Sequence, residues 1–135
     1  MNVIKEYNYT KDSSLDHDLV LTILNISNMS DQKTLSKLSK HLNPIIRSAI
    51  ARNNNTDIKI KLNLIKDPIP YVRRCVDISS IPKKYIEEIL KNETDSTVIY
   101  IHIINIENAG CEINEYYNIL INNKHTPDEV LNKYK

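Results

Sequence analysis

The sequence predicts an all-α fold, a right-handed α-solenoid of short two-helix repeats of about 26 residues each. Three observations support this class: a pattern that recurs at a fixed step, the presence of a single glycine in 135 residues, and turns built from Asn, Asp, Ser and Pro. Few β-proteins form their turns with so little glycine, so the composition favours helices.

The repeat is clearest in the segment that begins at Asn43. Pro44 and Arg47 recur one repeat step later as Pro70 and Arg73. The same step relates Ile46 to Val72 and Val98, and Ala49 to Cys75 and Ile101; stepping backwards relates Ala49 to Ile23 and Ile50 to Leu24. The turn at 54–57 also echoes 28–31, but the related turn at Thr126 does not lie a whole number of repeats after Thr56. We therefore expect an irregular segment at 107–112.

Each repeat is predicted to contain two helices, which open at small polar caps or at proline. The clearest opening is Thr126-Pro127-Asp128-Glu129, where two acids follow the cap at the positive end of the helix dipole. Propensity alone would allow a strand at 97–106, because this stretch is β-branched, but the repeat favours a helix. The expected helices are 16–27, 31–41, 44–52, 57–66, 69–78, 82–91, 95–106, 112–122 and 127–134.

The chain is expected to form one domain, 1–135, whose parts differ in regularity. Residues 1–14 are polar and aperiodic and are predicted to be a loosely ordered arm. Residues 16–106 hold the regular repeats, and 107–135 are predicted to form an irregular C-terminal repeat or cap.

Residues 41–56 and 67–76 resemble the leucine-rich-repeat variant, a short relative of HEAT repeats. The resemblance covers 16–106 and, more weakly, 119–134, and it implies a helical-repeat architecture while saying little about function. The sequence departs from the family pattern at Ile99, where arginine stands in the other copies, and at His41, where the next copy has Asp67. Some relatives carry an iron–sulfur cluster on an N-terminal cysteine cluster, but no cysteine precedes Cys75, so no cofactor is expected.

Charge and cysteine content narrow the functional class. The formal net charge is +1, whereas dedicated nucleic-acid binders carry a clear basic excess. The chain begins without an apolar signal core and has no apolar run long enough to span a bilayer, so we expect a cytoplasmic protein with two reduced thiols.

Seven residues are candidates for binding a partner. Arg47 and Arg73 are repeated, which favours a structural role in which each bonds an acid or a carbonyl, with Asp67 as the expected partner of Arg73. The other cations are not repeated and are predicted to add to a basic strip on one face, although a solvated surface balanced by acids is the simpler interpretation. The full candidate set is Arg47, Arg52, Tyr71, Arg73, Arg74, Lys83 and Lys84.

Other chemistry-bearing residues have structural interpretations. Tyr85 is predicted to be core and Tyr71 exposed, His102 to be partly buried, and Cys75 to be a small core residue. The histidines and cysteines lack metal-ligand spacing, and no catalytic motif is present.

The function predicted from these features is non-catalytic protein recognition by an adaptor, inhibitor or immunity-type protein. The partner is another protein, bound on the face formed by the second helices, and the chain itself is a monomer or a weak homo-oligomer. The alternative is a nucleic-acid-binding module or a HEAT-like DNA repair module that uses the basic strip. A third possibility is a purely structural subunit, for which self-association would be the sign. Convergence of the basic side chains in a groove would favour nucleic acid, and pairing with acids would oppose it.

Overall fold

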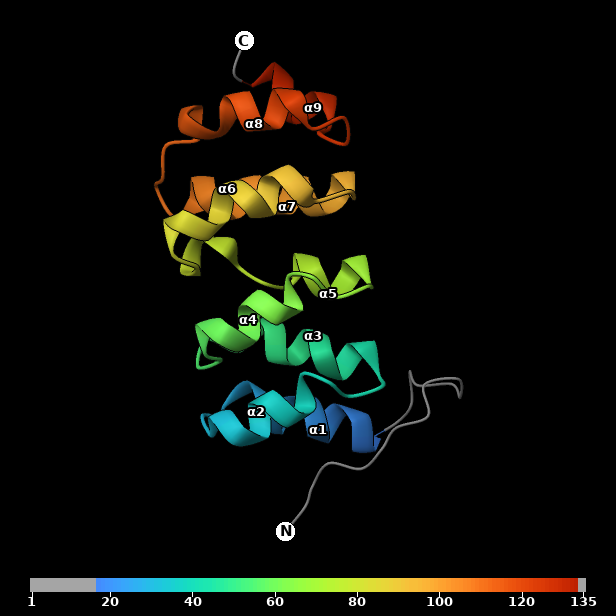
Figure 1. Cartoon of the computed structure of the whole chain (residues 1–135). Coiled ribbons are helices and arrows are strands. Elements are labelled where there is room, and N and C mark those ends of the chain that lie inside the picture. Colours follow the sequence, from blue (N-terminus) through green and yellow to red (C-terminus); the bar gives the residue numbers. More distant parts are fainter. Residues whose placement is uncertain (1–16, 134–135) are drawn as a thin grey trace. The chain divides into compact units, whose positions relative to one another are not determined.

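The computed structural model describes residues 17–133, and this part of the chain is entirely helical, without strands (Figure 1). It divides into two compact units, and the boundary falls between Val76 and Asp77. The first unit contains α1 (His17–Ser27), α2 (Gln32–Leu38), α3 (Pro44–Arg52), α4 (Ile58–Leu64) and α5 (Pro70–Arg74). The second contains η2 (Ile78–Ser80), α6 (Lys83–Asn92), α7 (Ser96–Asn108), η3 (Asn114–Tyr116), α8 (Tyr117–Asn122) and α9 (Asp128–Asn132).

The predicted all-α class is confirmed, and the ambiguous stretch at 97–106 is helical within α7. The helix predicted at 44–52 matches α3, whereas those predicted at 31–41, 57–66 and 69–78 end earlier because their last residues form turns. The segment predicted at 112–122 opens as a 3-10 turn before α8. The expected arm at 1–14 lies outside the described residues. None of the helices in 17–133 combines the length and apolar composition that a membrane crossing requires.

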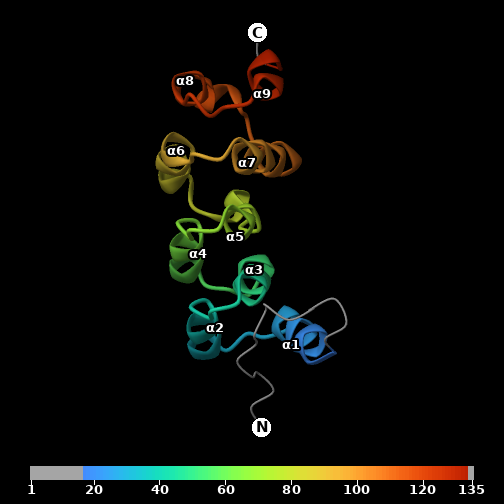
Figure 2. The same ribbon diagram turned by 90° about the vertical axis from the view of Figure 1, so that its right-hand side faces the viewer.

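In the first unit the helices form two rows, with α1, α3 and α5 in one and α2 and α4 in the other (Figure 2). The central helix is α3, which contacts the other four. Its residues Ile46 and Ile50 are at most 1% exposed and form the middle of this unit's core. Asn43 helps α3 to begin, because its side-chain oxygen accepts a hydrogen bond from the Ile45 N–H at 2.9 Å and Pro44 occupies the first turn.

The burial pattern follows the repeat step at two positions, of which one lies within each second helix and the other lies in it or just after its end. Ile46, Val72 and Val98 share one position, and Ile50, Val76 and His102 share the other; all six are at most 1% exposed. His102 is thus fully buried instead of partly buried as expected. Cys75 is only half-buried, so the prediction that it is core was wrong. It lies just beyond the end of the short helix α5, near the exposed surface that Arg74 occupies.

The first helix departs from the repeat step by a single position. Leu24, expected to align with Ile50, is 58% exposed. The buried residues Leu19, Thr22 and Ile26 correspond instead to Ile46, Ala49 and Asn53, at a separation slightly longer than the step. The caps of the following helices, Asp31 and Asp57, keep the step itself, so the segment from Ile26 to Asp31 is one residue longer than the equivalent segment from Asn53 to Asp57.

The turn after α3 is fastened by a buried asparagine, Asn53, which is 4% exposed. Its Nδ2 donates hydrogen bonds to the carbonyls of Ile26 at 2.7 Å and Met29 at 2.8 Å, at the end of α1. Its Oδ1 accepts from the Asn55 N–H at 2.8 Å. Thr56 completes the turn, because its hydroxyl donates to the Ile50 carbonyl at 2.8 Å. One amide therefore joins the C-terminal ends of two neighbouring helices, where carbonyls lack helical partners.

The second unit contains the same arrangement at Asn123. Its Nδ2 donates to the carbonyls of Leu90 at 2.8 Å and Glu93 at 2.9 Å, and its Oδ1 accepts from the His125 N–H at 2.9 Å. The Thr126 hydroxyl donates to the Leu120 carbonyl at 2.6 Å. Thr56 and Thr126, although out of step in the sequence, thus belong to two copies of one turn, which we call the asparagine bridge.

The break in the repeat follows α7, where the chain's single glycine lies. Gly110 has φ 77°, in the left-handed region that glycine tolerates best. Its N–H bonds the Glu107 carbonyl at 2.9 Å, and the Cys111 N–H bonds the Ile106 carbonyl at 3.1 Å. This pair of bonds is a Schellman motif, which ends α7 within the segment expected to be irregular.

Replacing Val72 by Asp should unfold the first unit. Val72 is fully buried, and an unpaired carboxylate there costs about 3–5 kcal/mol of unfolding free energy. Thermal melting followed by circular dichroism measures this loss. The matched control is Ile69→Asp at the exposed cap position of the same helix, which should leave the melt nearly unchanged because Asp suits that position. A normal melt for Val72→Asp would show that the assigned core is wrong.

Replacing Asn53 by Asp tests the asparagine bridge. The carboxylate keeps an acceptor for the Asn55 N–H but faces the Ile26 and Met29 carbonyls without a donor, so we expect a loss of about 2–4 kcal/mol. The exposed neighbour provides the control, since Asn54→Asp makes the same chemical change and should be nearly neutral. Equal denaturant midpoints for the two variants would contradict the structural role of the bridge.

Candidate functional site

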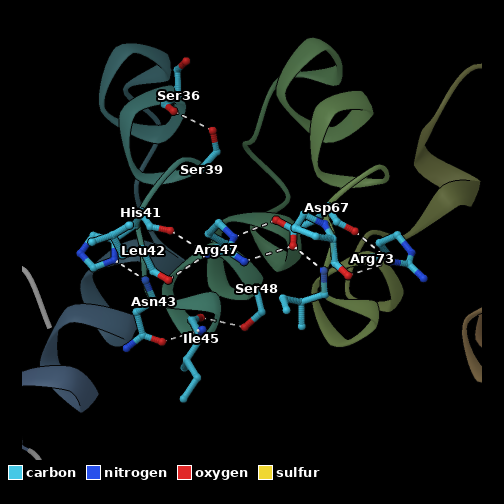
Figure 3. A network of polar contacts seen from close by, with 12 residues as sticks. Ser36, Ser39, His41, Leu42, Asn43, Ile45, Arg47, Ser48, Asp67 and Arg73 are labelled. Carbon is cyan, nitrogen blue, oxygen red and sulfur yellow. Dashed lines mark hydrogen bonds and ion pairs between the residues drawn. The ribbon is translucent and has the colours of Figure 1, made fainter. Parts of the chain in front are cut away.

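The repeated arginine Arg47 is committed to internal contacts. Its Nε and Nη2 donate to the Asp67 carboxylate at 2.8 and 3.2 Å, and its Nη1 donates to the carbonyls of His41 at 2.8 Å and Leu42 at 3.1 Å (Figure 3). The side chains of the ion pair are only 13% and 6% exposed. A bidentate pair this shielded from water fixes the two loops that carry it.

The other repeated arginine, Arg73, contacts the backbone. Its Nη1 donates to the Asp67 carbonyl at 2.9 Å and the Pro68 carbonyl at 3.4 Å (Figure 3). Arg73 thus bonds the predicted partner, Asp67, through its carbonyl, whereas the Asp67 carboxylate accepts from Arg47 and from the Ile69 N–H at 2.9 Å. The ion pair therefore joins two successive repeats instead of lying within one.

The residue at the position of Asp67 accepts hydrogen bonds from nearby backbone N–H groups in each of three successive repeats. His41, one repeat step earlier, accepts from the Asn43 N–H through Nδ1 at 3.0 Å. Glu93, one repeat step later, accepts from the N–H groups of Thr94 and Asp95 at 2.9 Å. Three different side chains thus supply an acceptor for the loop that leads into the second helix. This explains how His41 can replace an acid without loss of the turn.

The non-repeated arginines Arg52 and Arg74 meet on Tyr71. The Arg52 guanidinium carbon lies 5.4 Å from the centroid of the Tyr71 ring and that of Arg74 lies 4.7 Å from it, which is cation–π geometry. Arg52 Nη2 also donates to the Tyr71 hydroxyl at 2.8 Å. The packing of α3 against α5 brings these residues together from the ends of both helices. We call this cluster the arginine–tyrosine cluster.

The pKa values of Arg52 and Cys75 depend on burial and on contacts within the cluster. Partial burial lowers the pKa of Arg52, but the hydrogen bond to Tyr71 and the nearby Cys75 raise it by more, so the net pKa is raised. Burial raises the pKa of the Cys75 thiol, and the charges of Arg52 and Arg74 oppose this without reversing it. The thiol is therefore neutral near pH 7 and is not activated as a nucleophile.

The two candidate lysines lie in the second unit and have their own partners. Lys83 forms an exposed ion pair with Glu115, which raises the pKa of Lys83. Lys84 places its ammonium 5.0 Å from the Tyr85 ring centroid. Tyr85 is half-buried, so the prediction that it is core was wrong. Of the six candidate cations, the structure thus brings Arg52 and Arg74 together and assigns the other four to separate contacts.

Two further features bear on chemistry. A shallow, open pocket of about 360 Å³ lies in the second unit and is lined by Ser96, Thr97, Tyr100, Pro127 and Glu129. Glu129 is the single carboxylate among these lining residues. Within residues 17–133, no three His, Cys, Asp or Glu side chains gather as a metal site would require.

Sequence reasoning missed the buried partners of Asn53 and Asn123. The shared pattern Asn-x-x-Thr at 53–56 and 123–126 is the signal that would have found them. No model of a known family matches the chain, and no curated protein or solved structure shows significant similarity to it.

A double-mutant cycle on Arg47 and Asp67 should give a large coupling energy. The pair is bidentate and mostly buried, so we expect about 1–3 kcal/mol from the unfolding free energies of Arg47→Ala, Asp67→Ala and the double variant. The exposed ion pair of Lys83 and Glu115 provides the comparison. The same cycle with Lys83→Ala and Glu115→Ala should give no measurable coupling energy. Additive effects at Arg47 and Asp67 would contradict a structural ion pair.

Proposed function

We propose that this chain is a non-catalytic recognition protein, a helical-repeat domain of the leucine-rich-repeat-variant or HEAT-like type whose second helices bind another protein. The observation that carries the proposal is the difference between the arginines of the first unit. The guanidinium group of Arg47 bonds Asp67 and two backbone carbonyls within the chain. Arg52 and Arg74, in contrast, are exposed and stack on Tyr71. Arginine and tyrosine are among the residue types that most often dominate protein interfaces.

The proposed solenoid rests on three features. The sequence repeats at a fixed step, the burial pattern follows that step in α3, α5 and α7, and the first unit has two rows of helices. In such stacks, side chains repeated at every step serve packing, and those that vary are left for recognition. Arg52 and Arg74 belong to the variable group.

Protein is favoured over nucleic acid by charge. The chain carries a net charge of +1, and Arg47 and Lys83 are neutralised by carboxylates. A duplex or single strand presents a long row of phosphates, which a pair of guanidinium groups does not match. Action inside the cell is part of the proposal and is supported by the free thiols of Cys75 and Cys111.

Site-specific photo-crosslinking tests this function. A benzophenone amino acid at Ile45 occupies the position in α3 that Tyr71 has in α5, one repeat step later, and should capture a protein of defined mass in cells that express the chain. The same group at Lys59, an exposed residue of the first-helix row on α4, should capture much less. Capture that disappears after nuclease treatment would favour nucleic acid, and equal capture at both positions would contradict a binding face on the second helices.

A further inference from the structure

We propose that the arginine–tyrosine cluster of Arg52, Tyr71 and Arg74 receives an acidic segment of the partner and binds a side-chain carboxylate. This inference deepens the proposed function and rests on it.

The two guanidinium groups form no ion pair in the described part of the chain. Both residues are exposed, and both direct their guanidinium groups to the neutral ring of Tyr71. Arg47, by comparison, donates hydrogen bonds to a carboxylate and to two backbone carbonyls. Arg52 and Arg74 therefore carry positive charge that no carboxylate within the described residues of the first unit neutralises.

Tyr71 contacts both cations. Its ring lies within 5.4 Å of one guanidinium carbon and 4.7 Å of the other, and stacking on an aromatic face leaves the edge N–H groups of a guanidinium pointing outward. Its hydroxyl oxygen accepts from Arg52, so the hydroxyl proton remains available to donate. The two guanidinium edges and the hydroxyl thus offer several donors around Tyr71 to the carboxylates of one acidic segment.

The charge of the site selects the class of ligand. A planar carboxylate accepts two parallel N–H bonds from a guanidinium, and two arginines match one or two neighbouring acidic side chains. A polyphosphate backbone would need further cations along its path, and Arg47 is already paired. The fitting ligand is an acidic peptide segment, which binds weakly by itself because the site is exposed to solvent.

The experiment uses the whole chain labelled with ¹⁵N and the peptide acetyl-Glu₆-amide as the probe. Arginine Nε–Hε resonances are followed by NMR during titration. We expect saturable shifts at Arg52 and Arg74, much smaller shifts at Arg47, and a binding constant in the range of about 0.1–1 mM at low salt that weakens with added salt. Absence of shifts at Arg52 and Arg74 up to several times that range, about 5 mM, would overturn the proposal.

Variants with equal charge changes provide the controls. Arg52→Gln with Arg74→Gln should weaken peptide binding at least about tenfold, while Lys59→Gln with Lys66→Gln, which removes two exposed charges near α4, should change it less than about twofold. Tyr71→Phe keeps the ring but removes the hydroxyl and should weaken binding severalfold. Circular dichroism melts verify that each variant folds. Equal weakening by the two double variants would mean nonspecific attraction and would overturn the proposal, as would tighter binding of hexathymidylate at the same two arginines.

Cross-linking through Ile45 in the Arg52→Gln/Arg74→Gln background separates this inference from the proposed function. Loss of the captured protein in that background, together with peptide binding to the unmodified chain, supports both. Undiminished capture without peptide binding would overturn the acidic-ligand assignment and leave protein recognition standing. Peptide binding at the cluster without any captured protein would support the ligand chemistry and overturn the recognition role.

Discussion

Every turn of this molecule must satisfy backbone groups that its short helices leave unpaired. An α-helix leaves its first four N–H and last four C=O groups without helical partners, and the α-helices within residues 17–133 have only 5 to 13 residues. Many chains place glycine at such ends, but this one contains a single glycine. Side chains take its place: Asn53 and Asn123 donate to carbonyls, Asp67 and Glu93 accept from N–H groups, and Arg47 bridges two loops. The packing of the helices depends on these contacts.

Much of the fold was predictable because its signals are local. Proline, a small polar cap and apolar spacing located α3 to the residue. The position of α1 was less predictable, because Val20, Leu21, Ile23 and Leu24 are all apolar and the pattern does not single out the buried face. Only the three-dimensional structure shows that this helix is shifted by a single position from the repeat step, with Leu19 and Ile26 turned inward.

The candidate site was predictable in composition but not in arrangement. Arg73 is closer than Arg47 to Asp67 in the sequence, yet Arg47 holds the carboxylate, because a long side chain reaches the neighbouring loop as easily as its own. The meeting of Arg52, Tyr71 and Arg74 likewise depends on how α3 and α5 pack, and no local pattern encodes it. The two arginines that recur at the repeat step, Arg47 and Arg73, bond groups within the chain. The two that do not recur, Arg52 and Arg74, lie at the surface.

The asparagine bridge also affects how the molecule ages chemically. Asparagine loses ammonia over time when the following backbone nitrogen attacks its side-chain carbonyl carbon, a reaction that requires a mobile side chain. Asn53 is held at both ends of its amide, whereas its neighbour Asn54 is exposed. The Asn55 nitrogen, which would attack the Asn54 side chain, also bonds Asn53 Oδ1, so the bridge opposes deamidation at Asn54 as well. The hydrogen bonds through which Asn53 joins the two helices thus also protect its amide from deamidation.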